Sequence, residues 1–214
     1  GTVFEFLRNN AMDALPYFAA KGTSTAPLRR NQFGAAVGGP IIKNRLFYFL
    51  NYNGIRLDQP QEENQIVPSA ALRSGNLNDL IGPPAHDPFT LAPFQNNQIP
   101  AGELDGAAQF FLNPAIIPLP NQPDGLHYIY GPAATSNTDQ GDIRIDDQIN
   151  QKDSLFGRFS INDNLDISPG ALPAFGGTTN TINTKNIGVG YTHIFTPNLL
   201  NNLRIGYAHL LDEN

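Results

Sequence analysis

Residues 142–146 read Asp-Ile-Arg-Ile-Asp, and residues 155–161 read Leu-Phe-Gly-Arg-Phe-Ser-Ile. Because successive side chains of a strand point to opposite sides, each run has one mainly apolar face and one mainly polar face. A turn of about three residues between the runs would set Asp146 opposite or diagonal to Arg158, within cross-strand pairing range. The stretch therefore predicts a β-hairpin with an apolar side and a charged side.

The same alternation recurs along the chain and predicts about seven strands. They fall at residues 1–9, 31–42, 46–52, 142–146, 155–161, 186–195 and 203–207. Tight turns are expected near Asn44, Lys152 and Pro197, whereas the connections between them are long loops, near 10–30, 54–138 and 164–184.

Short and long connections thus alternate. In an outer-membrane barrel, short turns lie at the periplasmic rim and long loops at the extracellular rim, and the strands alternate apolar-out and polar-in. A soluble β-sandwich is the alternative for such strands, but it has no reason to separate loop lengths in this way. The pattern favours an all-β fold, an antiparallel transmembrane β-barrel segment with long extracellular loops.

Composition is consistent with this fold class. The 214 residues include 20 glycines and 18 prolines, which disfavours long helices, and no cysteine. No run approaches the roughly 20 apolar residues of a transmembrane helix. The net charge of -6 provides no basic surface, so no nucleic-acid partner is expected. The start at Gly1, without Met or a signal segment, suggests an internal or processed piece of a longer protein.

Strand alternation assigns side chains to the two sides of the predicted barrel wall. The polar residues expected to face the lumen are Asp142, Arg144, Asp146, Arg158 and Arg204. The residues expected to face lipid are Ile143, Ile145, Phe159, Ile161, Val189, Tyr191, Ile205 and Tyr207. The lumenal set either holds a plug and lines a ligand path, or only satisfies the polar interior that is generic to barrels.

Residues 58–138 hold no strand period, and residues 54–138 are predicted to form a large extracellular loop with a helix at 103–112. A connection of this length is normally a functional loop or a subdomain. Some of its aromatic side chains are candidate contacts for an extracellular ligand, although such residues also anchor a loop to itself. They are Phe89, Phe94, Phe110, Phe111, Tyr128 and Tyr130.

The sequence predicts neither an enzyme nor a metal or cofactor site. His86, His127, His193 and His209 are too scattered for a zinc pattern, and no Cys is present to complete one. There is no Gly-x-Ser-x-Gly elbow, and the serines and carboxylates lack an obvious base partner. We expect no catalytic residues.

Three stretches resemble the start of the barrel in Oar-like TonB-dependent receptors of the acidobacterial type, which often carry a carboxypeptidase-regulatory-like N-terminal domain. They are residues 1–9, 30–44 (Arg-Asn-Gln-Phe-Gly-Ala-Ala-Val-Gly-Gly-Pro-Ile-Ile-Lys-Asn) and 46–56 (Leu-Phe-Tyr-Phe-Leu-Asn-Tyr-Asn-Gly-Ile-Arg). The large loop is also similar in its ordered short motifs, at 67–76, 87–88, 97–100 and 118–121. The resemblance covers nearly the whole chain.

The resemblance implies a receptor in the bacterial outer membrane, a nominally 22-stranded barrel with an internal plug that imports a ligand with energy relayed by TonB. Residues 1–214 would then be a partial barrel whose strands are too few to close it. The expected partners are outer-membrane lipid, an extracellular ligand, and the TonB complex through a plug and TonB box that are not among these residues.

Two rival hypotheses remain at this point. One is a structural or adhesive outer-membrane barrel whose long loops bind surfaces and whose lumen transports nothing. The other is a secreted, soluble β-rich binding module or carbohydrate-active domain, which would stay in the aqueous fraction without detergent.

Overall fold

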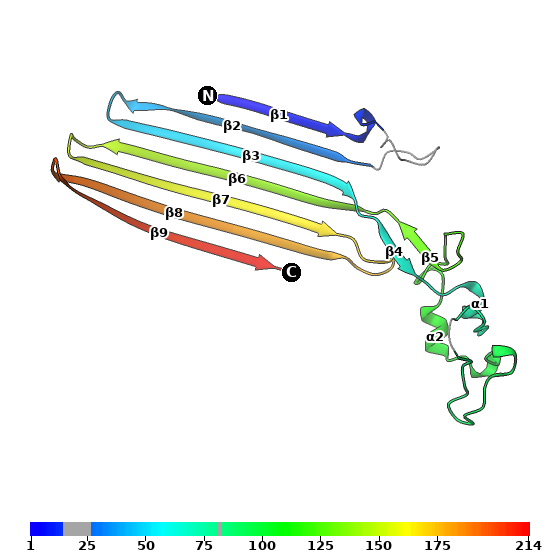
Figure 1. The fold of residues 1–214 in the computed structure, drawn as a ribbon. Helices are drawn as coiled ribbons and strands as arrows, with labels where there is room; N and C mark the ends of the chain where they lie inside the picture. The colour runs from blue at the N-terminus through cyan, green and yellow to red at the C-terminus, as the bar shows by residue number, and fades with distance from the viewer. Residues whose placement is uncertain (15–26, 81–82) are drawn as a thin grey trace. The chain divides into compact units, whose positions relative to one another are not determined.

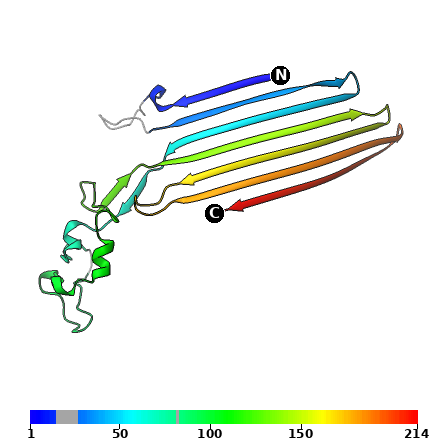
Figure 2. The same cartoon turned by 180° about the vertical axis from the view of Figure 1, so that it is seen from behind.

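The computed structural model describes residues 1–14, 27–80 and 83–214, and most of them belong to one antiparallel sheet (Figure 1). Its seven strands lie in the order β1-β2-β3-β6-β7-β8-β9, and Figure 2 shows the same order from behind. The bounds are β1 Thr2–Asn9, β2 Arg29–Ile42, β3 Leu46–Pro60, β6 Ala133–Gln148, β7 Asp153–Ser168, β8 Thr178–Thr196 and β9 Leu199–Glu213. The all-β antiparallel fold is confirmed.

All seven predicted strands are present, but several are longer than their sequence patterns. β3 continues to Pro60 and β6 begins at Ala133, so residues 54–60 and 133–138 lie in strands and the predicted loop 54–138 is too long at both ends. The loop expected at 164–184 is likewise shortened to 169–177. In these extensions the polar side chains interrupt the apolar alternation, but the backbone pairing continues.

The connections alternate as expected. The turns between β2 and β3, β6 and β7, and β8 and β9 are tight and meet at one end of the sheet (Figure 1). Asn44 adopts a left-handed backbone conformation in the first of them, with φ of 62°. The long connections leave from the opposite end; the first contains the 3₁₀ turn Asn10–Met12, and residues 15–26 of the predicted loop 10–30 lie outside the described residues.

Glycines in the strands leave room for aromatic rings of the neighbouring strand. A Cβ on Gly34 would lie 2.6 Å from the Phe4 ring, and one on Gly54 would lie 2.7 Å from the Phe33 ring. Each glycine is paired directly with that phenylalanine. These rings cover strand positions that have no side chain of their own, so glycine is required there by close approach.

The remaining described residues form a separate unit, which comprises Gln61–Pro132 and Pro169–Gly177 and which we call the loop unit. It contains a two-stranded sheet of β4 (Glu63–Ile66) and β5 (His127–Tyr130). Its helical elements are α1 Ala70–Arg73, α2 Gly106–Phe111 and two 3₁₀ turns, Gln95–Asn97 and Ala101–Glu103. The helix predicted at 103–112 is therefore present with narrower bounds, and the Asp105 carboxylate caps it by accepting the Ala107 and Ala108 N–H groups at 2.9 and 3.0 Å.

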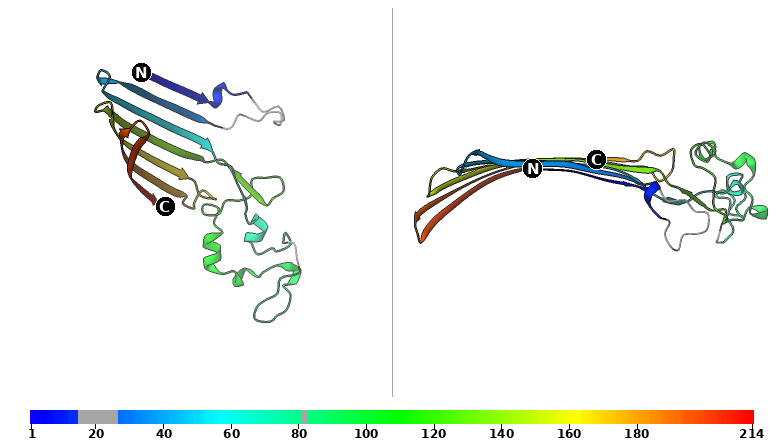
Figure 3. Two further views of the ribbon diagram at one scale, coloured as in Figure 1. Left: turned by 60° about the vertical axis from the view of Figure 1, so that its left-hand side comes forward. Right: turned by 90° about the horizontal axis from the view of Figure 1, so that it is seen from above.

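The sheet is a single curved layer, seen edge-on in the right view of Figure 3. Among the described residues Val67 of the loop unit is the only buried hydrophobic residue, and many large apolar side chains of the strands are exposed. A β-sandwich buries the inner faces of two sheets against each other. The described strands contain no such layer, which removes the sandwich alternative. Among the described residues, no helix has both the length and the apolar character needed to span a bilayer.

Candidate functional site: the two faces of the sheet

One face of the sheet carries a continuous apolar band, and we call it the apolar face. Direct pairing aligns one row of residues across six strands: Val37, Leu50, Ile143, Phe159, Ile187 and Tyr207. All six are exposed. The eight residues predicted to face lipid all lie on this face. Each belongs to this row or lies an even number of positions from the row residue on its own strand, and side chains two positions apart share a face.

A polar cluster borders the band at the end of the long connections. The Tyr52 hydroxyl donates to the Asp139 carboxylate at 2.5 Å, and the Arg56 guanidinium donates to both oxygens of that carboxylate at 2.9 Å. The Arg56 guanidinium also lies 5.6 Å above the centre of the Phe33 ring. All four side chains are on the apolar face. The aromatic residues Phe33 and Tyr52 and the ion pair of Arg56 with Asp139 therefore mark this border.

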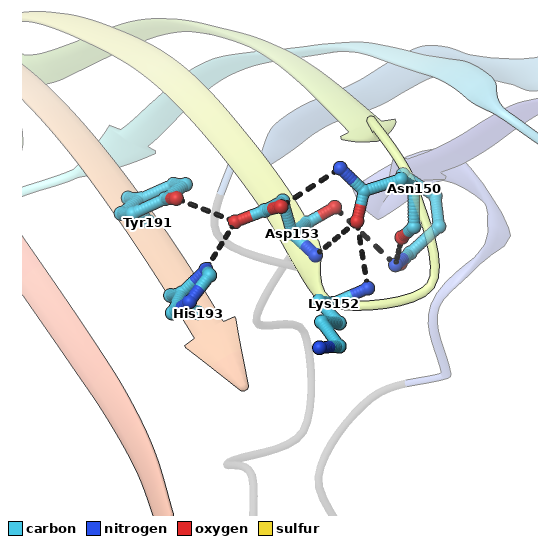
Figure 4. Close-up of polar contacts among 6 residues, drawn as sticks. Asn150, Lys152, Asp153, Tyr191 and His193 are labelled. Carbon is cyan, nitrogen blue, oxygen red and sulfur yellow. Dashed lines mark hydrogen bonds and ion pairs between the residues drawn. The ribbon is translucent and has the colours of Figure 1, made fainter. Parts of the chain in front are cut away.

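A second polar cluster borders the band at the tight-turn end (Figure 4). The Asp153 carboxylate is bonded to the Tyr191 hydroxyl and to His193 Nδ1, each at 2.5 Å. Its other oxygen accepts from Asn150 Nδ2 at 2.7 Å, and Asn150 Oδ1 in turn accepts the Lys152 and Asp153 backbone N–H groups at 2.8 and 3.0 Å. The turn between β6 and β7 is thereby tied to β8.

The distance between the two clusters matches the height of the apolar band in a transmembrane barrel. Asp139 pairs with Asp163, so Asp153 lies about ten residues from Asp139 along the strand direction, roughly 33 Å at the rise of a strand. A tilt of about 40° reduces this to a height of roughly 25 Å, the height of the apolar band in transmembrane barrels. Tyr52 and Tyr191 direct their hydroxyls away from the middle of the band, as interfacial tyrosines do.

The opposite face carries charged and amide side chains with aromatic rings among them, including Phe47, Phe49 and Phe156, and we call it the polar face. All five predicted lumenal residues lie on it. Arg144 bonds to Asp146 in a bidentate ion pair, with distances of 2.6 and 2.8 Å, and its guanidinium lies 4.4 Å above the centre of the Phe156 ring. Asp146 is diagonal to Arg158, as expected, but Arg144 itself lies directly opposite Arg158. Pairing with Asp146 offsets the repulsion between these two arginines.

Asp142 takes part in a different set of contacts on the polar face. Its carboxylate accepts from Asn51 Nδ2 on β3 at 3.1 Å and from Gln140 Nε2 at 3.2 Å. The Asn51 bond joins β3 to β6 in addition to their backbone ladder, whereas the Gln140 bond lies within β6. The predicted lumenal residues therefore fall into two sets. Asp142 accepts hydrogen bonds from side-chain amides, and Arg144, Arg158 and Arg204, with Asp146, form what we call the arginine group.

The arginine group borders a shallow trough of about 600 Å³. The Arg158 side chain lies beside Gly188, where an added Cβ would be 3.6 Å from the Arg158 Cγ, and Arg204 pairs directly with Gly190. Gly206 extends the side-chain-free floor. The guanidinium of Arg204 donates to Asn202 Oδ1 at 2.9 Å, an uncharged acceptor. The trough thus has cationic borders, and the Phe156 ring also lines it.

In the loop unit, Arg73 is the main connecting residue. Its guanidinium donates to the carbonyl groups of Pro68 at 2.9 Å, of Ile117 and Pro118 at 2.7 Å, and of Leu112. Burial lowers the pKa of Arg73. One side chain thus holds residues 68 and 112–118 together.

A second contact of the loop unit joins Asp124 and His127. The carboxylate accepts the Leu126 and His127 N–H groups at 2.9 and 3.0 Å and bonds to the His127 ring. These bonds, the backbone ones first, lower the pKa of Asp124 to about 2. The two residues border an open pocket of about 460 Å³, together with Asn64, Gln122, Pro123 and Ile129.

The aromatic residues predicted as ligand contacts fall into two groups. Tyr128 and Tyr130 are half-buried with ring centres 5.7 Å apart, and the Tyr130 hydroxyl bonds to the Gly170 carbonyl, while Phe94 is also half-buried. By contrast, Phe89 is 94% exposed. The other exposed rings are Phe110 and Phe111.

Sequence reasoning missed both polar clusters at the borders of the band. In the sequence pattern, Arg56 falls in the predicted loop 54–138 and Asp139 directly follows it. Asp153 has no assigned role, and His193 is weighed only as a zinc ligand. No local pattern marks these contacts, because the bonded residues are about 40 to 80 positions apart in the chain. Among the described residues, no group of three or more His, Asp or Glu side chains is arranged to hold a metal ion.

Comparison with known proteins identifies the family. No curated protein and no solved structure matches the chain. The family model described as outer membrane beta barrel domain matches residues 1–214, the whole sequence. This match places the chain in the bacterial outer membrane and excludes the secreted soluble module. The chain belongs to the outer membrane β-barrel domain family.

Proposed function

We propose that the chain is part of the barrel of a TonB-dependent outer-membrane receptor, which binds an extracellular ligand and imports it. The apolar face contacts lipid, and the polar face forms the inner wall. The observation that carries this proposal is the division of the sheet into an unbroken exposed apolar band and an arginine-bordered polar face. The proposed work is binding and gated passage, without covalent chemistry.

The loop unit supports a receptor role. Its strands β4 and β5 and the Arg73 contacts give the long connection between β3 and β6 a defined structure. Ligand-binding loops are commonly held in a fixed shape so that little ordering entropy is lost on binding. The exposed rings of Phe89, Phe110 and Phe111 are available for contact. An adhesive barrel would use the same surface, so transport must be tested directly.

The polar face supports passage. Arg158 and Arg204 border the trough, whose floor includes Gly188 and Gly206, and the Phe156 ring covers Gly190 between them. Such a surface can hold a plug by polar contacts that exchange with water or ligand. A purely structural wall needs polar satisfaction but no such open trough.

The test uses the intact outer-membrane protein that contains this chain. Cells that express it, and cells that express a form with residues 63–130 replaced by a short Gly/Ser linker, are grown in a defined mixture of siderophores, cobalamin, oligosaccharides and peptides. Uptake is measured by mass spectrometry of the medium, with and without a proton uncoupler. In parallel, the purified receptor is tested for binding to the purified periplasmic domain of TonB.

We expect at least one compound to be depleted only by energised cells with the complete loop unit, and we expect the receptor to bind the TonB domain. Heat-modifiable gel mobility confirms that both forms assemble as barrels. Assembly without TonB binding and without energy-dependent depletion would contradict import and leave the structural or adhesive barrel.

A further inference from the structure

The loop unit carries the whole net charge of the sequence. Residues 61–132 and 169–177 contain seven Asp or Glu residues and one basic residue, Arg73, for a net charge of -6. The rest of the sequence has twelve acidic and twelve basic residues and is neutral. Arg73 donates to four backbone carbonyl groups, and none of its bonds in the described loop unit goes to a carboxylate. The loop unit therefore attracts cations and repels anions.

The carboxylates of the loop unit are spread along it rather than gathered at one point. Asp79 and Asp87 accept from serine and threonine hydroxyl groups, and Asp105 caps α2. Glu62 and Glu103 are exposed, and neither carboxylate has a partner in the part of the chain that the structure describes. A small cation such as Ca²⁺ needs about six to eight oxygen ligands close together. Spread charge instead suits a ligand whose own cations are spaced along a chain.

The outer edge of β4 is open. Gln61 and Val67, which flank β4, donate their N–H groups to carbonyl groups beside β5, both at 2.9 Å. Bonded residues alternate along an antiparallel ladder, so the N–H and C=O groups of Asn64 and Ile66 point away from β5. No other described residue bonds to these outward groups. β4 therefore has backbone donors and acceptors free for an added strand.

The outer edge of β5 is already occupied. The Asn121 N–H donates to the His127 carbonyl at 3.0 Å. The Asn121 side-chain amide donates to the Ile129 carbonyl at 2.7 Å and accepts the Ile129 N–H at 2.9 Å. Asn121 thus takes the place of a neighbouring strand, and β4 is the edge left for a further one. Because a two-stranded sheet alone is only marginally stable, a third strand would stabilise it.

Negative charge lies where side chains of an added strand would project. Glu62, Asn64 and Ile66 alternate onto one face of β4, and all three are exposed. Asn64 and Asp124 border the open pocket on this face. A Lys or Arg side chain projecting from an added strand on this face would meet the carboxylates of Glu62 and Asp124. An acidic side chain there would be repelled.

We propose that the loop unit binds an extended, basic peptide segment that adds to β4 as a third strand and sets Lys or Arg side chains beside Glu62 and Asp124. Backbone bonds along the edge provide affinity, and the charge of the loop unit provides selectivity against acidic peptides. Because it names the class of ligand, the inference rests on the proposed receptor function, but peptide binding is measured separately from import.

The test is a binding measurement with the intact outer-membrane protein that contains this chain, purified in detergent micelles. The probe is a fluorescein-labelled peptide of alternating Lys and Val residues, and binding is followed by fluorescence anisotropy at low and high salt. Two matched peptides are controls. One has Glu in place of Lys, and the other keeps its side chains but has N-methylated backbone amides, which cannot donate to a strand edge.

We expect the Lys-Val peptide to bind and to bind more weakly at high salt. The Glu-Val peptide should not bind, and the N-methylated peptide should bind about tenfold more weakly or worse, because its backbone bonds are lost. Equal binding of the Lys-Val and Glu-Val peptides, or of the Lys-Val and N-methylated peptides, would overturn the proposal. Absence of binding by the Lys-Val peptide would also overturn it.

Two variants of the protein test the position of the peptide. Glu62→Lys should weaken binding of the Lys-Val peptide by about tenfold. Glu103→Lys is the matched control, because Glu103 is equally exposed but lies in the 3₁₀ turn Ala101–Glu103, outside β4 and β5, and it should weaken binding by no more than about twofold. Both variants are first checked for heat-modifiable gel mobility. Equal losses in the two variants would overturn the assignment to β4.

The outcome is distinguishable from that of the uptake experiment. Selective peptide binding by a protein that imports nothing would support this inference and contradict the proposed import. Energy-dependent uptake of another compound by a protein that does not bind the Lys-Val peptide would support import and overturn this inference alone.

Discussion

The interactions that stabilise the sheet differ from those that stabilise the loop unit. In the sheet, seven strands are joined by continuous backbone pairing, and many apolar side chains are exposed, which the proposed function would bury in lipid. In the loop unit, short elements are joined by side-chain bonds to backbone groups, above all those of Arg73, and Val67 is the only buried hydrophobic residue among the described residues. The difference teaches that the sheet depends on its surroundings and on periodicity, whereas the loop unit depends on a few individual side chains.

The largest expected effect comes from a charge on the apolar face. Phe159→Arg should destabilise the assembled barrel by about 2 to 4 kcal/mol, the cost of a cation at the middle of the bilayer. Stability is measured by urea titration of the protein folded in lipid vesicles, and assembly by heat-modifiable gel mobility. Ser160→Arg, the next residue on the polar face, is the matched control and should be tolerated. Equal effects at both positions would contradict the assignment of the faces.

In the loop unit, the largest effect should come from Arg73→Ala. The variant leaves four carbonyl groups without their donor, and we expect a local loss of roughly 2 to 3 kcal/mol, as for bonds to a charged group. Hydrogen exchange should increase at residues 68–76 and 112–118 and stay unchanged in β6 and β7. Arg73→Lys keeps the charge but not the forked donors, so it should behave almost like the alanine variant. A lysine variant with wild-type exchange would show that charge alone is sufficient.

A smaller effect is expected from a single methyl group in the sheet. Gly190→Ala places a Cβ in the space of the Phe156 ring, so the ring must move, at about 1 kcal/mol. Gly188→Ala, two residues away on the same face, is the control, because its nearest neighbour is Arg158 Cγ at 3.6 Å. Urea titration midpoints in lipid vesicles should decrease for the first variant only. A reversed order would mean that the ring does not occupy this position.

The smallest expected effect is the pH response of the Asp124 turn. The folded-state pKa of about 2 lies below the ordinary aspartate pKa of about 3.9, so the contribution of this carboxylate to stability is present above pH 4 and is lost as the pH falls through 2. A ¹³C carboxyl titration of the protein in micelles should give a midpoint near 2. In Asp124→Asn, hydrogen exchange at residues 121–127 should lose its dependence on pH in this window, after correction for intrinsic exchange. A midpoint near 3.9 would contradict the turn.

The extent to which the sheet was predictable differs from that of the loop unit. Alternation alone placed Ile143 and Phe159 on one face and Arg144 and Arg158 on the other, because the side-chain period of a strand is a local property. In the loop unit, only the α2 helix was predicted with its approximate bounds. The role of Arg73 was not, since its acceptors lie up to 45 residues away and a lone arginine carries no pattern.

By itself, the sequence determined the strand periodicity, the two faces, the tight turns near Asn44, Lys152 and Pro197, and the alternation of short and long connections. Only the tertiary structure decided that β3 pairs with β6, the sheet strand that follows the loop unit in the sequence, and that both strands extend beyond their apolar patterns. It also decided that Arg56 forms an ion pair with Asp139. It also decided the register that sets Arg144 opposite Arg158. The physical reason is that faces follow from the local geometry of one strand, whereas neighbours, register and strand ends follow from hydrogen bonds between residues far apart in the chain.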